Sequence, residues 1–130
     1  RPRDDRYGHP AGDTILSKMS ATVSERLRPY DRIYRYGGEE FLICLPDTEP
    51  RQAHQIIERL RLEIARRPVP TGDRLIPITV SFGLAKLEPD RPVEASIARA
   101  DEALYRAKRG GRNRVMVESR SGWVAATPAP

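Results

Sequence analysis

The spacing of apolar residues along this chain of 130 residues predicts three amphipathic helices. Apolar side chains recur every three or four positions, which is the period of one face of an α-helix. The first helix is expected over 14–27, after a polar loop over 1–13. The second is expected over 51–66, and the third runs from about Pro92 to a stop at Gly111. The apolar faces consist of Ile15, Leu16, Met19, Val23 and Leu27; of Ala53, Ile56, Ile57, Leu60 and Ile64; and of Ile97, Ala100, Leu104 and Ala107.

A β-hairpin is predicted between the first two helices. The short run 32–34 and the apolar run 41–45 flank Gly37 and Gly38. A two-residue turn of the favoured hand needs positive φ at both positions, and glycine adopts positive φ without a steric clash. We therefore expect a two-residue Gly-Gly turn.

The remaining chain is expected to contain two more strands. Apolar and polar residues alternate between Ile76 and Phe82, which predicts a strand within 75–86 after a loop over 68–73. A short closing strand is expected over 115–117 and a loose tail over 119–130. The order helix, hairpin, helix, strand, helix, strand predicts an α+β fold.

The composition of the chain limits the classes of protein to which it can belong. The chain has no apolar run long enough to span a membrane, it opens with charged residues, and it holds one cysteine. These features predict a cytoplasmic segment without membrane contact, and they exclude a disulfide framework. The net charge of +5 permits anionic partners. Because the basic residues are dispersed, a local phosphate site is favoured over a nucleic-acid groove, although a nucleic-acid-binding module stays open as a hypothesis.

The candidate chemistry centres on Glu39 and Glu40, which follow the two glycines. Two adjacent carboxylates at the start of an apolar strand repel each other unless a cation is present. Mg²⁺ binds one or two carboxylates and leaves its other positions to water and phosphate oxygens. The alternative is that the glycines form only a turn and the glutamates are solvated surface residues.

The segment RYGGEEF over 35–41 resembles the signature of GGDEF domains, the diguanylate cyclases, in the variant with Glu at the third position of the motif. Four further segments resemble that family at the proper spacing. They are DDRYGHPAGD over 4–13, RPYD over 28–31, ITVSFGLA over 78–85 and ADEALYRAKRGGRN over 100–113. Agreement at five separate places is hard to obtain by chance.

The resemblance implies a palm-like nucleotidyl cyclase fold, in which helices pack on a central, antiparallel-rich sheet. It implies one domain over 1–118. In the family a core strand with the pattern D-x-D-x-F-K precedes this region and supplies a metal-binding aspartate. Arg1 falls on the lysine position, so this first core strand is missing and we expect the chain to be part of a longer protein.

The implied activity is condensation of two GTP molecules into cyclic di-GMP and pyrophosphate, by a two-fold homodimer under an upstream sensory or regulatory domain. By resemblance, Glu39 and Glu40 are catalytic and bind Mg²⁺ or Mn²⁺. The implied GTP-binding residues are Asp4, Asp13, Gly37, Gly38, Lys108 and Arg112. Those of an inhibitory cyclic di-GMP site with the pattern R-x-x-D are Arg28, Asp31 and Arg59.

Several of these residues also suit purely structural roles. Asp13 suits the first turn of a helix, and basic residues such as Lys108 and Arg112 suit a helix C-terminus. Arg59 is spaced to pair with Glu63 one turn away. Asp4 stands where the family usually has asparagine, and it accepts but does not donate hydrogen bonds. A catalytically silent domain that binds cyclic di-GMP or GTP is therefore the alternative function.

Overall fold

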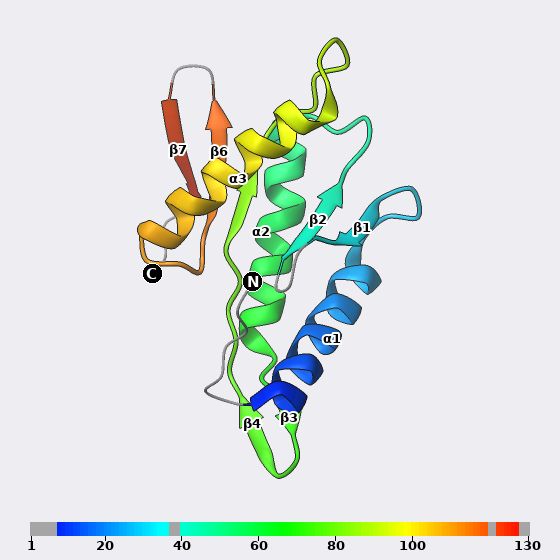
Figure 1. The fold of residues 1–130 in the computed structure, drawn as a ribbon, viewed down its shortest axis with the longest axis vertical. Coiled ribbons are helices and arrows are strands. Elements are labelled where there is room, and N and C mark those ends of the chain that lie inside the picture. The colour runs from blue at the N-terminus through cyan, green and yellow to red at the C-terminus, as the bar shows by residue number, and fades with distance from the viewer. Residues whose placement is uncertain (1–7, 37–39, 120–121, 128–130) are drawn as a thin grey trace. The chain divides into compact units, whose positions relative to one another are not determined.

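The computed structural model describes the backbone of residues 8–36, 40–119 and 122–127 and the side chains of 14–36 and 40–118. Its elements follow the order α1 (Gly8–Arg26), β1 (Arg32–Arg35), β2 (Phe41–Cys44), α2 (Pro50–Arg66), β3 (Val69–Thr71), β4 (Arg74–Ile76), β5 (Phe82–Leu84), α3 (Val93–Arg109), β6 (Val115–Ser119) and β7 (Gly122–Thr127) (Figure 1). They form two compact units. The first unit holds α1 and β1–β4, and the second holds α2, β5, α3, β6 and β7.

In the first unit, α1 begins at Gly8, six residues earlier than predicted. Pro10 does not prevent this, because the first N–H groups of a helix have no acceptor within the helix and proline loses nothing there. The predicted loop is therefore wrong for residues 8–13. Asp13 is the sixth helical residue, and no acidic residue lies in the first turn of α1. The capping role considered for Asp13 is wrong for the same reason.

The predicted pairing of the two hairpin strands is confirmed. Strands β1 and β2 pair antiparallel with Arg35 opposite Phe41, and the Tyr36 N–H donates to the Glu40 carbonyl at 2.8 Å. This hydrogen bond extends the ladder by one pair, to Tyr36 and Glu40. The predicted Gly-Gly turn lies outside the described residues.

The single strand predicted within 75–86 is also wrong, because two strands in different units occupy this stretch. β4 pairs with β3 through a two-residue turn in which Gly72 has a φ of 65°. Glycine at the first position of such a turn is a type II′ preference. Pro77 follows β4 and has no N–H to donate, so the ladder ends there. β5 begins only at Phe82.

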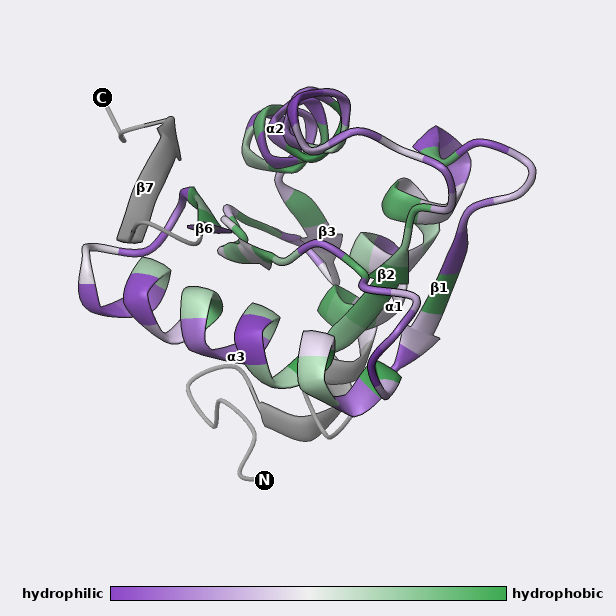
Figure 2. Ribbon diagram, turned by 90° about the horizontal axis from the view of Figure 1, so that it is seen from above, coloured by the Kyte–Doolittle hydropathy of each residue, from purple (hydrophilic) through white to green (hydrophobic). Residues whose placement is uncertain are grey.

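The second unit is a three-stranded sheet between two helices. β5 pairs parallel with β6, and β6 pairs antiparallel with β7. Helices α2 and α3 both contact β6 and lie on opposite sides of it (Figure 2). The buried apolar side chains of this unit are Ile57, Leu60, Ile64, Ala103, Ala107 and Val115. The predicted apolar face of α2 is thus confirmed in its central positions. On α3 only Ala107 of the predicted face is fully buried, and Ala103, which was not predicted, is buried beside it.

Two features shape the three-stranded sheet, namely the close approach of β5 to α3 at Gly83 and the pairing of the C-terminal segment with β6. A Cβ at Gly83 would lie 2.3 Å from the Ala100 carbonyl oxygen, so only glycine lets β5 approach α3 this closely. Gly83 therefore permits close packing of β5 against α3. The sequence also predicts a loose tail over 119–130, whereas residues 122–127 form β7. Trp123 and Val124 favour a strand, and β6 offers them a hydrogen-bonding edge.

Among the described residues, no helix has both the length and the hydropathy that crossing a membrane requires.

Candidate functional site

Glu40 is the described member of the carboxylate pair. It lies half-buried immediately before β2, and its main chain pairs with Tyr36. Gly37, Gly38, Glu39 and Asp4 lie outside the described residues. Within the described stretches, no three His, Cys, Asp or Glu side chains form a metal cluster. A magnesium ion that is completed by phosphate and water needs only one or two carboxylates, so the chemistry of Glu39 and Glu40 fits such an ion.

An open groove of about 430 Å³ lies between α1 and the hairpin in the first unit. Helix α1 contributes Leu16, Ser17, Ser20, Ala21 and Ser24, and the strands contribute Ile33, Arg35 and Phe41. Position 13 is four residues before Ser17, so it heads the same stripe of the helix. This groove was not predicted from the sequence. The signal was a helical stripe of small residues, whose short side chains leave space beside the strands.

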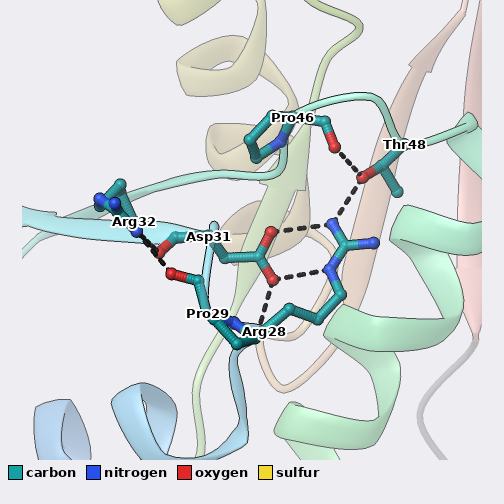
Figure 3. Close-up of polar contacts among 6 residues, drawn as sticks. All are labelled: Arg28, Pro29, Asp31, Arg32, Pro46 and Thr48. Atoms are coloured by element: carbon teal, nitrogen blue, oxygen red, sulfur yellow. Dashed lines mark hydrogen bonds and ion pairs between the residues drawn. The ribbon is translucent and has the colours of Figure 1, made fainter.

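Arg28 and Asp31 form a closed ion pair at the end of α1 (Figure 3). Asp31 Oδ2 accepts from the Arg28 backbone N–H at 2.8 Å and from Nε at 2.9 Å, and Oδ1 accepts from Nη2 at 2.8 Å. The same Nη2 donates to Thr48 Oγ1 at 2.6 Å. The Arg28 guanidinium also lies 4.8 Å from the centre of the Tyr30 ring.

The electrostatics of this pair follow from its geometry. Side-chain hydrogen bonds from Arg28 hold the pKa of Asp31 below its ordinary value, although burial acts in the opposite direction. The same hydrogen bonds raise the pKa of Arg28. The structure thus brings these two predicted residues together, with both Asp31 oxygens already engaged. Arg59, the third predicted member, is an exposed residue of α2 in the other unit.

Lys108 and Arg112 lie at the end of α3 in the second unit. Lys108 is half-buried in the last turn of the helix, and Arg112 is exposed in the turn that follows. Gly111 has a φ of 120°, which agrees with the predicted helix stop. The Arg112 N–H donates to the Ala107 carbonyl at 2.9 Å, so the turn closes back on the helix. Two basic residues therefore stand close together along this end of the helix.

Arg61 was not among the functional residues predicted from the sequence. It is 2% exposed and lies on the buried face of α2 beside Ile57, Leu60 and Ile64. It forms an ion pair with Glu58, at 2.6 Å between Nη2 and Oε2, and it donates to Asn113, 52 residues away. The available signal was a charged residue inside an apolar helical stripe, where an unpaired charge is rarely tolerated.

Comparison with known families identifies the class of protein. The sequence model of the family described as diguanylate cyclase, GGDEF domain, matches residues 3–114. The match covers most of the chain and includes all the motifs described above. The chain therefore belongs to the GGDEF domain family.

Curated relatives agree with this assignment. Over 114 residues the chain is 44% identical to the diguanylate cyclase DgcP of Pseudomonas aeruginosa, covering 88% of this chain and 17% of that protein. It is 38% identical over 117 residues to the response regulator PleD of Caulobacter vibrioides, covering 87% of this chain and 26% of that protein. The chain thus spans about a sixth to a quarter of the length of these two relatives.

Solved structures confirm the predicted palm-like α+β fold. Diguanylate cyclase SiaD of Pseudomonas aeruginosa, in complex with its activator SiaC, superposes with a TM-score of 0.84 at 34% identity, covering 88% of this chain and 44% of that one. The GGDEF domain of DgcB from Caulobacter crescentus, in complex with c-di-GMP, gives a TM-score of 0.80 at 34% identity, covering 87% of this chain and 68% of that one.

Proposed function

We propose that this chain is a diguanylate cyclase domain that condenses two GTP molecules into cyclic di-GMP and releases pyrophosphate. The observation that carries the proposal is the family match over residues 3–114, within which the carboxylates Glu39 and Glu40 are retained. The two adjacent carboxylates favour the enzyme over a silent binding domain, because a divalent cation that joins the reaction would offset their mutual repulsion.

The reaction is attack of a ribose 3′-hydroxyl on the α-phosphate of a second GTP, with pyrophosphate as leaving group. Glu40 and Glu39 would hold Mg²⁺ or Mn²⁺, which when bound supplies positive charge beside the phosphates. Glu39, which is adjacent to Glu40 in the sequence, would also accept the proton of the attacking 3′-hydroxyl. Lys108 and Arg112 would neutralise the triphosphate, while Gly37 and Gly38 leave room for the nucleotide because neither carries a Cβ.

Base recognition is assigned to the first unit. Asp13 would accept hydrogen bonds from guanine N1 and N2, with Asp4 as a second acceptor. The groove beside α1 supports this assignment, because its lining residue Ser17 lies one helical turn after position 13 and its volume of about 430 Å³ lies within the usual range for small-molecule sites. Asp13→Ala should lower the preference for GTP over ATP in competition binding. An unchanged ratio would remove Asp13 from base recognition.

Regulation would act through assembly and product. Each site holds one GTP, so two copies must meet as a two-fold homodimer, and an upstream sensory or regulatory domain would control that encounter. Arg28, Asp31 and Arg59 would bind cyclic di-GMP as an inhibitory site. The arginine fork suits guanine edges or phosphates.

A second candidate function is a silent domain that binds cyclic di-GMP or GTP as a regulatory module. Asp4 favours it, because a carboxylate there cannot donate to guanine as the usual asparagine does. Loss of that donor would weaken substrate binding while leaving the inhibitory site unaffected.

The deciding experiment is a product assay on the protein that contains this chain, isolated as a dimer and supplied with GTP and Mg²⁺. We expect cyclic di-GMP and pyrophosphate from the wild type. Glu40→Ala should form neither product while its unfolding curve stays unchanged, because a half-buried residue at the sheet edge contributes little core packing. A verified dimer that forms no cyclic di-GMP would exclude the cyclase and leave the regulatory module.

A further inference from the structure

The turn after α3 has an unfavourable backbone conformation. Gly111, Arg112 and Asn113 have φ values of 120°, 62° and 48°. Glycine adopts positive φ freely, whereas arginine is rarely found there and asparagine is found there several-fold more often than most residues. Two consecutive non-glycine residues in this region persist only when the surrounding structure holds them. The contacts of this turn therefore identify the groups that hold it.

Hydrogen bonds hold every main-chain polar group of Asn113 and Arg112. The Asn113 N–H donates to Ser81 Oγ at 3.0 Å, and its carbonyl oxygen and Oδ1 accept from Arg61 Nη1 at 3.2 and 2.7 Å. The Arg112 N–H donates to the Ala107 carbonyl at 2.9 Å, and the Arg112 carbonyl accepts from Arg114 Nε at 3.1 Å. Arg61 is the contact that reaches this turn from α2.

Arg61 is itself held on two sides. Its Nε and Nη2 donate to the two carboxylate oxygens of Glu58 at 2.8 and 2.6 Å, so the guanidinium plane is fixed within α2. These hydrogen bonds to Glu58 raise the pKa of Arg61, although burial acts to lower it. A rigid guanidinium with five donors can bridge a carboxylate and two oxygens of another residue at once, which a lysine ammonium cannot do with the same geometry. Arg61 therefore transmits the position of α2 to the turn.

We infer that Arg61 is a positioning residue for the triphosphate site. By clamping Asn113, it sets the direction in which the preceding residue, Arg112, leaves the turn beside Lys108. The inference rests on the proposed function, in which these two basic residues bind the triphosphate. Arg61 does not touch substrate in this account, since it is buried and its donors are used by Glu58 and Asn113.

The first test measures binding of 3′-deoxy-GTP with Mg²⁺, because this nucleotide lacks the attacking hydroxyl and does not react. Arg61→Lys should raise its Kd between about tenfold and a hundredfold, as small misplacements of a binding group do. The Kd of guanosine, which has no phosphates, should stay unchanged. Arg66→Lys is the matched control, because Arg66 is an exposed arginine in the last turn of the same helix and should leave both values unchanged.

The second test is a double-mutant cycle with Arg112→Ala. If Arg61 acts through Arg112, then Arg61→Lys should change the Kd of 3′-deoxy-GTP less than about twofold when Arg112 is already alanine. Effects that multiply would overturn the inference, as would equal losses of guanosine and 3′-deoxy-GTP binding. If Arg112→Ala alone leaves the Kd unchanged, the proposed role of Arg112 fails first, and the inference fails with it.

A second variant covers the case in which Arg61→Lys does not fold. Asn113→Gly keeps a residue that adopts positive φ easily, and it removes the side-chain contact with Arg61. It should weaken 3′-deoxy-GTP binding in the same selective way and should show the same non-additivity with Arg112→Ala. Binding of 3′-deoxy-GTP at the wild-type Kd by a folded Asn113→Gly variant would contradict the clamp.

Discussion

Each of the two units contains an arginine paired with a carboxylate three residues away. The carboxylate is the more buried partner in one pair, and the arginine is the more buried partner in the other. In the first unit the Arg28 side chain is 22% exposed and that of Asp31 is 0% exposed. In the second unit the Arg61 side chain is 3% exposed and that of Glu58 is 16% exposed. Solvent is thus excluded from Asp31 in the first pair and from Arg61 in the second pair.

This difference separates two uses of one chemical group. Arg28 retains contact with solvent, so it can exchange part of its hydrogen bonding for a ligand at a modest desolvation cost. Arg61 is enclosed, and its remaining donor capacity is directed at the oxygens of Asn113. The first arrangement suits binding of an anionic or guanine-bearing ligand, and the second suits holding a turn in place.

The largest effect is expected on stability from Arg61→Met. This change leaves Glu58 without its cation and leaves the Asn113 oxygens without a donor, and breaking a buried pair in this way costs about 3–5 kcal/mol. Urea denaturation measures the loss. Arg66→Met, which removes an exposed arginine from the same helix, should change the free energy of unfolding by less than about 0.5 kcal/mol. Equal stability of the two variants would show that the Arg61 network contributes no stability.

The next effect is on product inhibition. Arg28→Ala removes the guanidinium that we assign to the cyclic di-GMP site, so the inhibition constant for cyclic di-GMP should rise on the order of tenfold or more. The initial rate with GTP should not fall, because Arg28 is not assigned to the substrate. Initial-rate assays at increasing cyclic di-GMP measure both quantities. A lower initial rate with unchanged inhibition would reverse the assignment.

The smallest effect is on the pH dependence of stability. The pKa of Asp31 is lower in the folded state than its ordinary value of about 4 in the unfolded chain. The ionised carboxylate therefore stabilises the folded state fully above about pH 4, and this contribution is lost as the pH falls through the folded pKa. Urea midpoints measured from about pH 6 to about pH 2.5 should therefore fall less steeply for Asp31→Asn than for the wild type. Parallel curves would show that Asp31 does not contribute to acid sensitivity.

Elements with a strong period were predicted well from the sequence. Helices α2 and α3 and the pairing of β1 with β2 follow from apolar spacing, and the motif residues follow from the resemblance to GGDEF domains. The β3–β4 hairpin was missed although Gly72-Asp73 is a two-residue turn signal, because the apolar alternation from Ile76 to Phe82 outweighed it. A continuous strand across this stretch is not possible in a sheet interior, because Pro77 has no N–H to donate.

The tertiary contacts of the candidate site could not be predicted in the same way. The sequence places Arg28 and Asp31 at a known spacing, but only the fold shows that they pair with each other. Arg61 falls inside an apolar stripe, and its acceptor is 52 residues away on the turn after α3. Contacts of this kind depend on the tertiary fold of the second unit, and the local pattern of apolar and polar residues does not predict them.

The most direct test of this account is one set of initial-rate measurements on the wild type, Arg28→Ala and Arg61→Lys, each at varied GTP and varied cyclic di-GMP. We expect the wild type to form cyclic di-GMP. We expect Arg28→Ala to change the inhibition constant with KM for GTP unchanged, and Arg61→Lys to raise KM with the inhibition constant unchanged. Absence of product from the wild-type dimer, or a shift of the same constant in both variants, would contradict the account.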